Sequence, residues 1–206
     1  MDGDFFMKHK AIVPVLLLGL ALWFWTGVLT VREQAALSDK LLRLHVVAAS
    51  DSETDQAIKL QVRDRVLAAA ARYTADADTA AEAAAALTMH LGELEEEAEM
   101  CLAELGAEEA VTVTLAREEF STREYDTFAL PAGQYETLRV VIGAGMGHNW
   151  WCVVFPSLCT AATAGEMEQA AVSAGLTQGE VTWITDDDAD VRVRFRILEL
   201  LQKLFS

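Results

Sequence analysis

Residues 11–31 constrain this chain more than any other segment. They read AIVPVLLLGLALWFWTGVLTV, a stretch of 21 residues without a charged side chain. At about 1.5 Å per residue, a helix of this length crosses the roughly 30 Å hydrocarbon core of a membrane. Lys8 and Lys10 precede it, and cations in front of a span keep the N-terminus in the cytoplasm. We therefore expect residues 1–10 to be cytoplasmic and the bulk of the chain to be extracytoplasmic.

A cleaved signal peptide is the alternative interpretation of this segment. Signal peptides have an apolar region of about 7–15 residues followed by small residues at the cleavage site. The stretch here is longer, and neither Ala35 nor Ala36 has a small residue two positions upstream. We favour an uncleaved anchor and leave cleavage open. Either way, residues 32–40 form a linker and residues 41–206 a membrane-anchored or secreted domain.

The charge of the chain limits its partners. Lys and Arg number 16 against 32 Asp and Glu, a formal net charge of −16. A domain this acidic repels the phosphate backbone, so we expect no nucleic-acid partner. Its charge fits either a basic protein surface or plain solubility.

The hydrophobic pattern of the domain predicts an α+β fold. Alternation over residues 41–48 predicts a first strand. Apolar side chains at helical spacing predict one helix over 53–73 and a second from 78 or 79 to 105, ended by Gly106. Further strands are expected at 111–116, 125–130, 135–143 and 150–155. We expect a mixed, largely antiparallel sheet, arranged as a meander and packed with the two long N-terminal helices.

The C-terminal part gives weaker patterns. Residues 166–174 resemble a short helix, and 181–184 suggest a strand. Residues 191–195 alternate as a strand does, and 197–205 return to helical spacing. Arginines at positions 192, 194 and 196 form a cationic stripe, which is either a partner contact or the wet face of an edge strand.

Two motifs that suggest ligand binding fail on inspection. Gly143, Gly145 and Gly147 have the spacing of a dinucleotide loop, but His148 replaces the next glycine and an aromatic strand follows, so we expect a hairpin loop. Alternating aspartates over 186–190 suggest a calcium loop, but the glycine and glutamate that such a loop requires are missing. We therefore predict no metal and no cofactor.

The cysteines offer one chemical and one structural possibility. His148 and Cys152 would stand about 13 Å apart on a strand, too far for a nucleophile and its base, so we predict no catalytic residues. Cys152 and Cys159 form a candidate disulfide, worth about 2–3 kcal/mol in an oxidising exterior. Two reduced core thiols are the alternative, and Cys101 is expected to pack as a small hydrophobe.

Three segments resemble one protein family. Leu42–Val66 (LRLHVVAASDSETDQAIKLQVRDRV) contains an arginine-bearing strand, an Asx-rich turn and the series Asp-Gln, Lys, Val-Arg-Asp. Leu130–Cys159 contains LPAGQYETLRVVIGAGMGHNWWCVVFPSLC, and Val193–Leu204 forms the third segment. These segments are similar to the stage II sporulation protein R family.

The resemblance implies a signal rather than an enzyme. Such proteins are made in the forespore and exported into the space between the two membranes. There they trigger a mother-cell membrane aspartic protease, stage II sporulation protein GA, which processes pro-sigma-E. An envelope cysteine hydrolase using Cys152 and a generic surface-binding module are the alternatives.

The tip of the last strong strand is our hypothesis for the partner contact. Exposed tryptophans dominate binding energy where they fill a pocket. Adjacent strand residues face opposite sides, so at least one tryptophan is expected in the core. The candidate contacts are Asn149, Trp150, Trp151, Gly145, Gly147 and Arg63.

Overall fold

The computed structural model describes residues 14, 17–19, 32–125, 127–160 and 163–185. The chain divides into two compact units, Met1–Ala36 and Leu37–Ser206. The expected membrane segment lies largely outside the described residues, and among those that are described no helix has the length and apolarity to cross a membrane. The expected linker is helical over residues 32–38. The expected elements at 191–195 and 197–205 lie outside the described residues.

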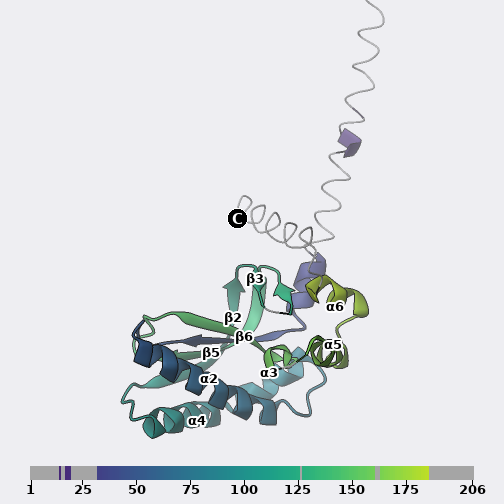
Figure 1. Cartoon of the computed structure of the whole chain (residues 1–206). Coiled ribbons are helices and arrows are strands. Elements are labelled where there is room, and N and C mark those ends of the chain that lie inside the picture. Colours follow the sequence, from purple (N-terminus) through teal and green to yellow (C-terminus); the bar gives the residue numbers. More distant parts are fainter. Residues whose placement is uncertain (1–13, 15–16, 20–31, 126, 161–162, 186–206) are drawn as a thin grey trace, which may run out of the picture. The chain divides into compact units, whose positions relative to one another are not determined.

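The main sheet of the second unit has four strands in the order β2-β5-β1-β6 (Figure 1). They are β1 (Leu42–Val47), β2 (Val111–Phe120), β5 (Gly133–Ile142) and β6 (Asn149–Phe155). Strand β1 pairs parallel with β5 and antiparallel with β6, and β5 pairs antiparallel with β2. The mixed, largely antiparallel α+β fold is therefore confirmed.

The expected meander is wrong, because the first strand is inserted between two later ones. Neighbouring strands in sequence usually pair, which makes a meander the default expectation. Strand β1 is buried along nearly its whole length, however, and such a strand is stable only in the middle of a sheet covered on both faces.

Three helices cover one face of the sheet, where two were expected. The helix α2 (Glu53–Tyr73) begins and ends where the pattern predicted. The second expected helix is two helices, α3 (Ala80–Met89) and α4 (Leu91–Glu104), broken at His90. His90 leaves helical geometry and its ring stacks on Tyr73 of α2, with centroids 4.1 Å apart. Because buried leucines continue at positions 87 and 94, the apolar spacing does not reveal the break.

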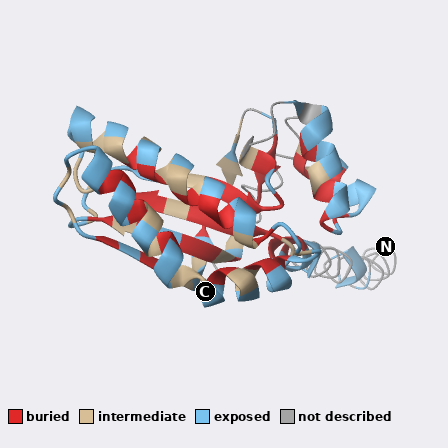
Figure 2. Cartoon of the chain, turned by 90° about the horizontal axis from the view of Figure 1, so that it is seen from below, coloured by how far each residue is buried: buried red, intermediate tan, exposed pale blue. Residues whose placement is uncertain are grey.

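The opposite face of the sheet is also covered. It packs under the short pair β3 (Arg123–Glu124) and β4 (Ala129–Leu130) and under the helices α5 (Ala164–Ser173) and α6 (Gln178–Thr185). The buried side of each element faces the sheet, and exposed residues lie outward (Figure 2). The sheet is therefore the middle layer between two hydrophobic clusters.

Helix α6 corrects the strand expected at 181–184, whereas α5 confirms the helix expected at 166–174. Thr177 and Glu180 start α6 with a reciprocal capping box: the Glu180 N–H donates to Thr177 Oγ1 at 3.2 Å, and the Thr177 N–H donates to Glu180 Oε2 at 2.7 Å. Val181 and Ile184, three residues apart, are both buried on one side. The extended run expected at 125–130 keeps only Ala129 and Leu130 in a strand.

Candidate functional site

The loop between β5 and β6 crosses the carboxyl end of β1. The expected hairpin is wrong, because β1 lies between the two strands that the loop connects. The backbone N–H groups of Met146 and Gly147 donate to the carbonyls of Ala49 and Ala48, at 3.2 and 3.0 Å. A Cβ added at Gly147 would lie 2.1 Å from the carbonyl oxygen of Ser50. Only glycine permits this approach of two backbones.

The same loop presents an apolar side chain at its tip. Gly145 has a left-handed backbone with φ +62°, and a Cβ there would lie 2.7 Å from Cγ1 of Val141. The loop therefore needs glycine at this position as well. Between the two glycines, Met146 is 79% exposed. The loop thus holds a large apolar side chain in solvent.

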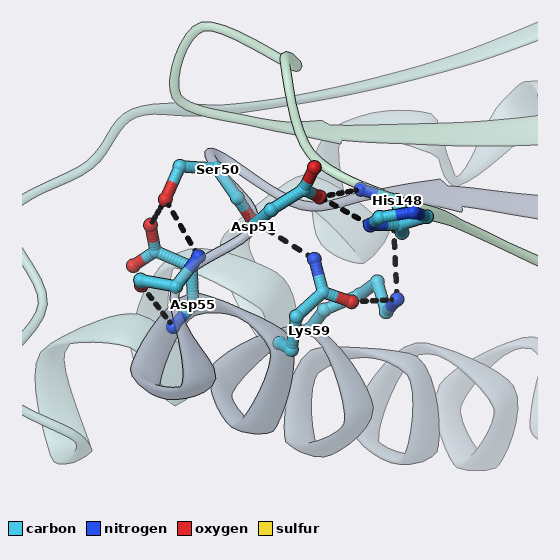
Figure 3. Close-up of polar contacts among 7 residues, drawn as sticks. Ser50, Asp51, Asp55, Lys59 and His148 are labelled. Carbon is cyan, nitrogen blue, oxygen red and sulfur yellow. Dashed lines mark hydrogen bonds and ion pairs between the residues drawn. The ribbon is translucent and has the colours of Figure 1, made fainter.

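Short polar side chains build the turn from β1 into α2 (Figure 3). Ser52 Oγ accepts the N–H of Asp55 at 3.1 Å and so caps α2. Ser50 Oγ donates to the Asp55 carboxylate and accepts the N–H of Ser52 at 3.1 Å. Gln56 Nε2 donates to the Ser50 carbonyl at 2.8 Å. These bonds fix the turn against the first turn of the helix.

His148 joins the loop to the turn and to α2 (Figure 3). Its backbone N–H donates to Asp51 Oδ1 at 2.6 Å, and its Nδ1 pairs with the same oxygen. Lys59 Nζ donates to the His148 carbonyl at 3.0 Å and to Gln56 Oε1 at 2.5 Å. Lys59 is only 5% exposed, and burial, followed by repulsion from Arg63, lowers its pKa. The loop is therefore clamped by an acid of the turn and a buried cation of α2.

An exposed tryptophan lies beside this clamp. Trp150 is 38% exposed, and the guanidinium carbon of Arg63 lies 4.4 Å from the ring centroid. Arg63 also pairs with Asp64 at 2.7 Å, and Asn149 is exposed. We call residues 48–51 and 143–150 together with Arg63 the loop–turn surface. It includes five of the six predicted contacts: Asn149, Trp150, Gly145, Gly147 and Arg63.

The sixth predicted contact faces the other way. Trp151 stacks on His45, with ring centroids 5.8 Å apart, and Arg123 covers its ring at 3.7 Å. His45 Nδ1 in turn bonds to Glu118 at 2.8 Å. Trp151 therefore packs on the second face of the sheet, away from the loop–turn surface.

A buried cation lies on that second face. Arg43 is 0% exposed, and its guanidinium carbon lies 3.9 Å from the ring centroid of Phe120 and 4.9 Å from that of Tyr135. Its Nη2 donates to the Tyr125 hydroxyl at 2.6 Å. Its Nε and Nη1 have no hydrogen-bond partner in the described part of the chain. Burying such a group costs several kcal/mol, which ring faces only partly offset.

The structure bears on both roles considered for the cysteines, a disulfide and a catalytic thiol. Cys101, Cys152 and Cys159 are free thiols, so the disulfide stays a prediction. Cys152 is buried, and hydrogen bonding with Cys159 together with burial raises the pKa of its thiol. The Cys152 thiol is 2% exposed and is hydrogen-bonded to Cys159, and no hydrogen bond between His148 and Cys152 occurs among the described residues. The aspartates at 186–190 lie outside the described residues, within which no metal-ligand cluster occurs.

Three residues that organise these two faces were not among the predicted contacts. Asp51 and Lys59 lie within Leu42–Val66, one of the segments that resemble the family. That resemblance could have indicated them as candidate site residues. Arg43 alternates with leucines along β1, a pattern that predicts a solvent-facing arginine. That pattern contains no information about the helices that cover the second face.

Tyr125 gives the Arg43 cluster a pH dependence. Burial raises the pKa of Tyr125 to about 12, although the Arg43 cation acts in the opposite direction. A folded-state pKa above the unfolded value of about 10 means that stability is complete below pH 10 and is lost as the pH rises toward 12. Two pKa units correspond to about 2.7 kcal/mol. The free energy of unfolding should fall between pH 10 and pH 12 in the parent protein. In Tyr125→Phe this fall should be smaller by up to about 2.7 kcal/mol, as measured by urea unfolding at the two pH values. An unchanged pH dependence would contradict the assignment.

Comparison with known proteins agrees with these features. The family model of stage II sporulation protein R matches residues 38–165. Stage II sporulation protein R of Bacillus subtilis (strain 168) is 33% identical over 127 residues, which is 62% of this chain and 57% of the relative. No solved structure matches the chain. The family model covers more than half of the chain, including β1, the capped turn, the glycine loop and β6, so the chain belongs to the stage II sporulation protein R family.

Proposed function

We propose that this protein is an intercellular sporulation signal that activates a membrane aspartic protease of the stage II sporulation protein GA type. It acts outside the cytoplasm, where residues 11–31 either anchor it in the membrane or serve as a cleaved signal peptide. It promotes processing of pro-sigma-E by binding rather than by catalysis. The relative's name supports a role in sporulation, and the family supplies the signalling class.

The observation that carries the binding proposal is the rigid display of apolar side chains on the loop–turn surface. Trp150 is partly exposed over Arg63, and Met146 is 79% exposed. Met146 belongs to the loop that is bonded to the turn and to α2, and Trp150 stands at the start of β6, directly after that loop. Large apolar groups held in place before binding lose little entropy on contact, so they contribute most of the affinity. A ligand of this kind activates a protease by binding its active state more tightly.

Reconstitution tests the proposal directly. The full chain is placed with the protease in membranes, pro-sigma-E is added, and the rate of its cleavage is measured. The chain should accelerate cleavage and should show no hydrolytic activity on pro-sigma-E without the protease. An unchanged cleavage rate over a wide range of chain concentrations would refute activation by binding.

Cys152→Ser separates the signal from the alternative cysteine hydrolase. Cys152 is 2% exposed and lies outside the loop–turn surface, so the variant should keep activation within about twofold once folded protein is compared. A hydrolase would lose its turnover on removal of the nucleophile. Circular dichroism and the cleavage rate are measured on the same preparation. Complete loss of activation by a folded variant would support the hydrolase.

A further inference from the structure

The guanidinium of Arg43 lacks a carboxylate partner among the described residues, yet three weak acids feel its charge. They are Tyr125, Tyr135 and Cys159. Burial outweighs the attraction of Arg43 at both tyrosines and raises their pKa values, so both stay neutral. At Cys159 the balance is reversed: a hydrogen bond from Cys152 lowers the thiol pKa most, and Arg43 lowers it further.

The backbone geometry supports an anion at Cys159. Arg43 lies directly opposite Val153 in the pairing of β1 with β6. The Val153 N–H donates to Cys159 Sγ at 3.0 Å, which satisfies a donor on an edge strand. Hydrogen bonds to a charged acceptor are stronger than those to a neutral one, so this donor favours the thiolate. Cys159 is also partly exposed, whereas Cys152 is buried.

We propose that Cys159, which accepts the Val153 N–H and is the more exposed of the two thiols, is the reactive thiolate of the Cys152–Cys159 pair, and that it starts oxidation of the pair by a disulfide-bearing oxidant, with the buried charge of Arg43 favouring the thiolate at longer range. Cys159 attacks one sulfur of the oxidant, and the other sulfur leaves as a thiolate. Cys152 then loses its proton to solvent and attacks Cys159 Sγ, which expels the second thiolate. Two protein thiols are oxidised to one disulfide, and the oxidant's disulfide is reduced to two thiols.

Oxidation has an electrostatic consequence for the core. A disulfide is neutral, so the negative charge that attracts Arg43 disappears when the bond forms. The closed loop constrains the unfolded chain, but the unpaired buried cation opposes that gain. The pair is therefore expected to be more easily reduced than a disulfide in a neutral core. This makes it a redox-responsive site at the edge strand β6, where Cys152 lies in the cluster under α2–α4 and Cys159 packs against both clusters.

The pH profile of Cys159 alkylation is the first test. The charged or titratable groups facing Cys159 are Arg43 of β1, Arg63 of α2, Cys152 of β6 and Tyr125 after β3. The full chain carrying Cys101→Ala is treated with iodoacetamide, and modification of Cys159 is followed by mass spectrometry. The midpoint should lie below the ordinary thiol value of about 8.5.

Variants of Arg43 then separate charge from packing. Arg43→Met should raise the midpoint by about one unit and slow alkylation at neutral pH about tenfold, whereas Arg43→Lys should stay close to the parent. Tyr125→Phe removes the hydrogen-bond acceptor of Arg43 but keeps the charge, so it should not raise the midpoint. A parent midpoint at or above the ordinary value overturns the proposal even where Arg43→Met does not fold. An unchanged midpoint in folded Arg43→Met overturns it as well.

Trapping with oxidised glutathione tests which sulfur attacks. In Cys152→Ser the adduct should accumulate on Cys159, because the resolving thiol is missing. In Cys159→Ser, adduct formation on Cys152 should be at least tenfold slower. The opposite pattern would assign the attack to Cys152 and contradict the proposal. Neither readout depends on activation of a protease.

Discussion

Replacing Gly147 with alanine should lower the free energy of unfolding by about 3 kcal/mol. The added Cβ would stand 2.1 Å from the Ser50 carbonyl oxygen, and the nearby obstacle is backbone rather than a flexible side chain. The loop has to move away, which also breaks the Gly147 N–H bond to the Ala48 carbonyl. Loss of Tm and of unfolding free energy in urea measures the effect.

Gly92→Ala is the matched control, because it makes the same substitution where space is open. Gly92 lies in the first turn of α4, and nothing lies within 4 Å of a Cβ built there. Alanine should therefore stabilise the helix by about 0.5–1 kcal/mol. Opposite signs for the two variants are the expected result. A Gly147→Ala protein within about 0.5 kcal/mol of the parent would mean that the loop yields without cost.

The elements that were predictable are those whose signal is local. The helix over 53–73 has a polar N-cap, a row of apolar residues at helical spacing and a defined C-terminus. Each of these features can be recognised from residues close together in the sequence. The strands around positions 42–47, 111–120, 133–142 and 149–155 were likewise visible as alternation or apolar runs. The loop–turn surface was predicted only in part: its glycines and tryptophan stand together in the sequence, whereas the residues that clamp the loop were not recognised.

What was missed depends on contacts between distant residues. The place of β1 between β5 and β6 joins segments roughly 90–110 residues apart, and no local pattern specifies strand order. His90 breaks a helix because its ring finds Tyr73. Arg43 is buried because Phe120 and Tyr135 cover it. In each case tertiary packing overrides the preference of the local sequence.

Replacing each of the two adjacent tryptophans with alanine should affect different properties: activation in one case and stability in the other. Trp150 is partly exposed on the loop–turn surface, so Trp150→Ala should reduce protease activation by about 2 kcal/mol, roughly thirtyfold, with a small effect on stability. Trp151 stacks between His45 and Arg123, so Trp151→Ala should cost about 3 kcal/mol of unfolding free energy. The cleavage rate of pro-sigma-E and urea unfolding are measured for both.

The comparison is informative because the two residues share a strand, a residue type and a substitution. A general weakening of β6 would lower stability and activation together in both variants. A binding role for Trp150 lowers activation at protein concentrations where the chain remains folded, and Trp150→Phe, which keeps an aromatic ring over Arg63, should recover part of it. Parent-like activation by Trp150→Ala would place the protease contact elsewhere on the domain. Because the ring of Trp151 on the opposite face is already engaged by His45 and by Arg123, the search would then move to the exposed side of α4.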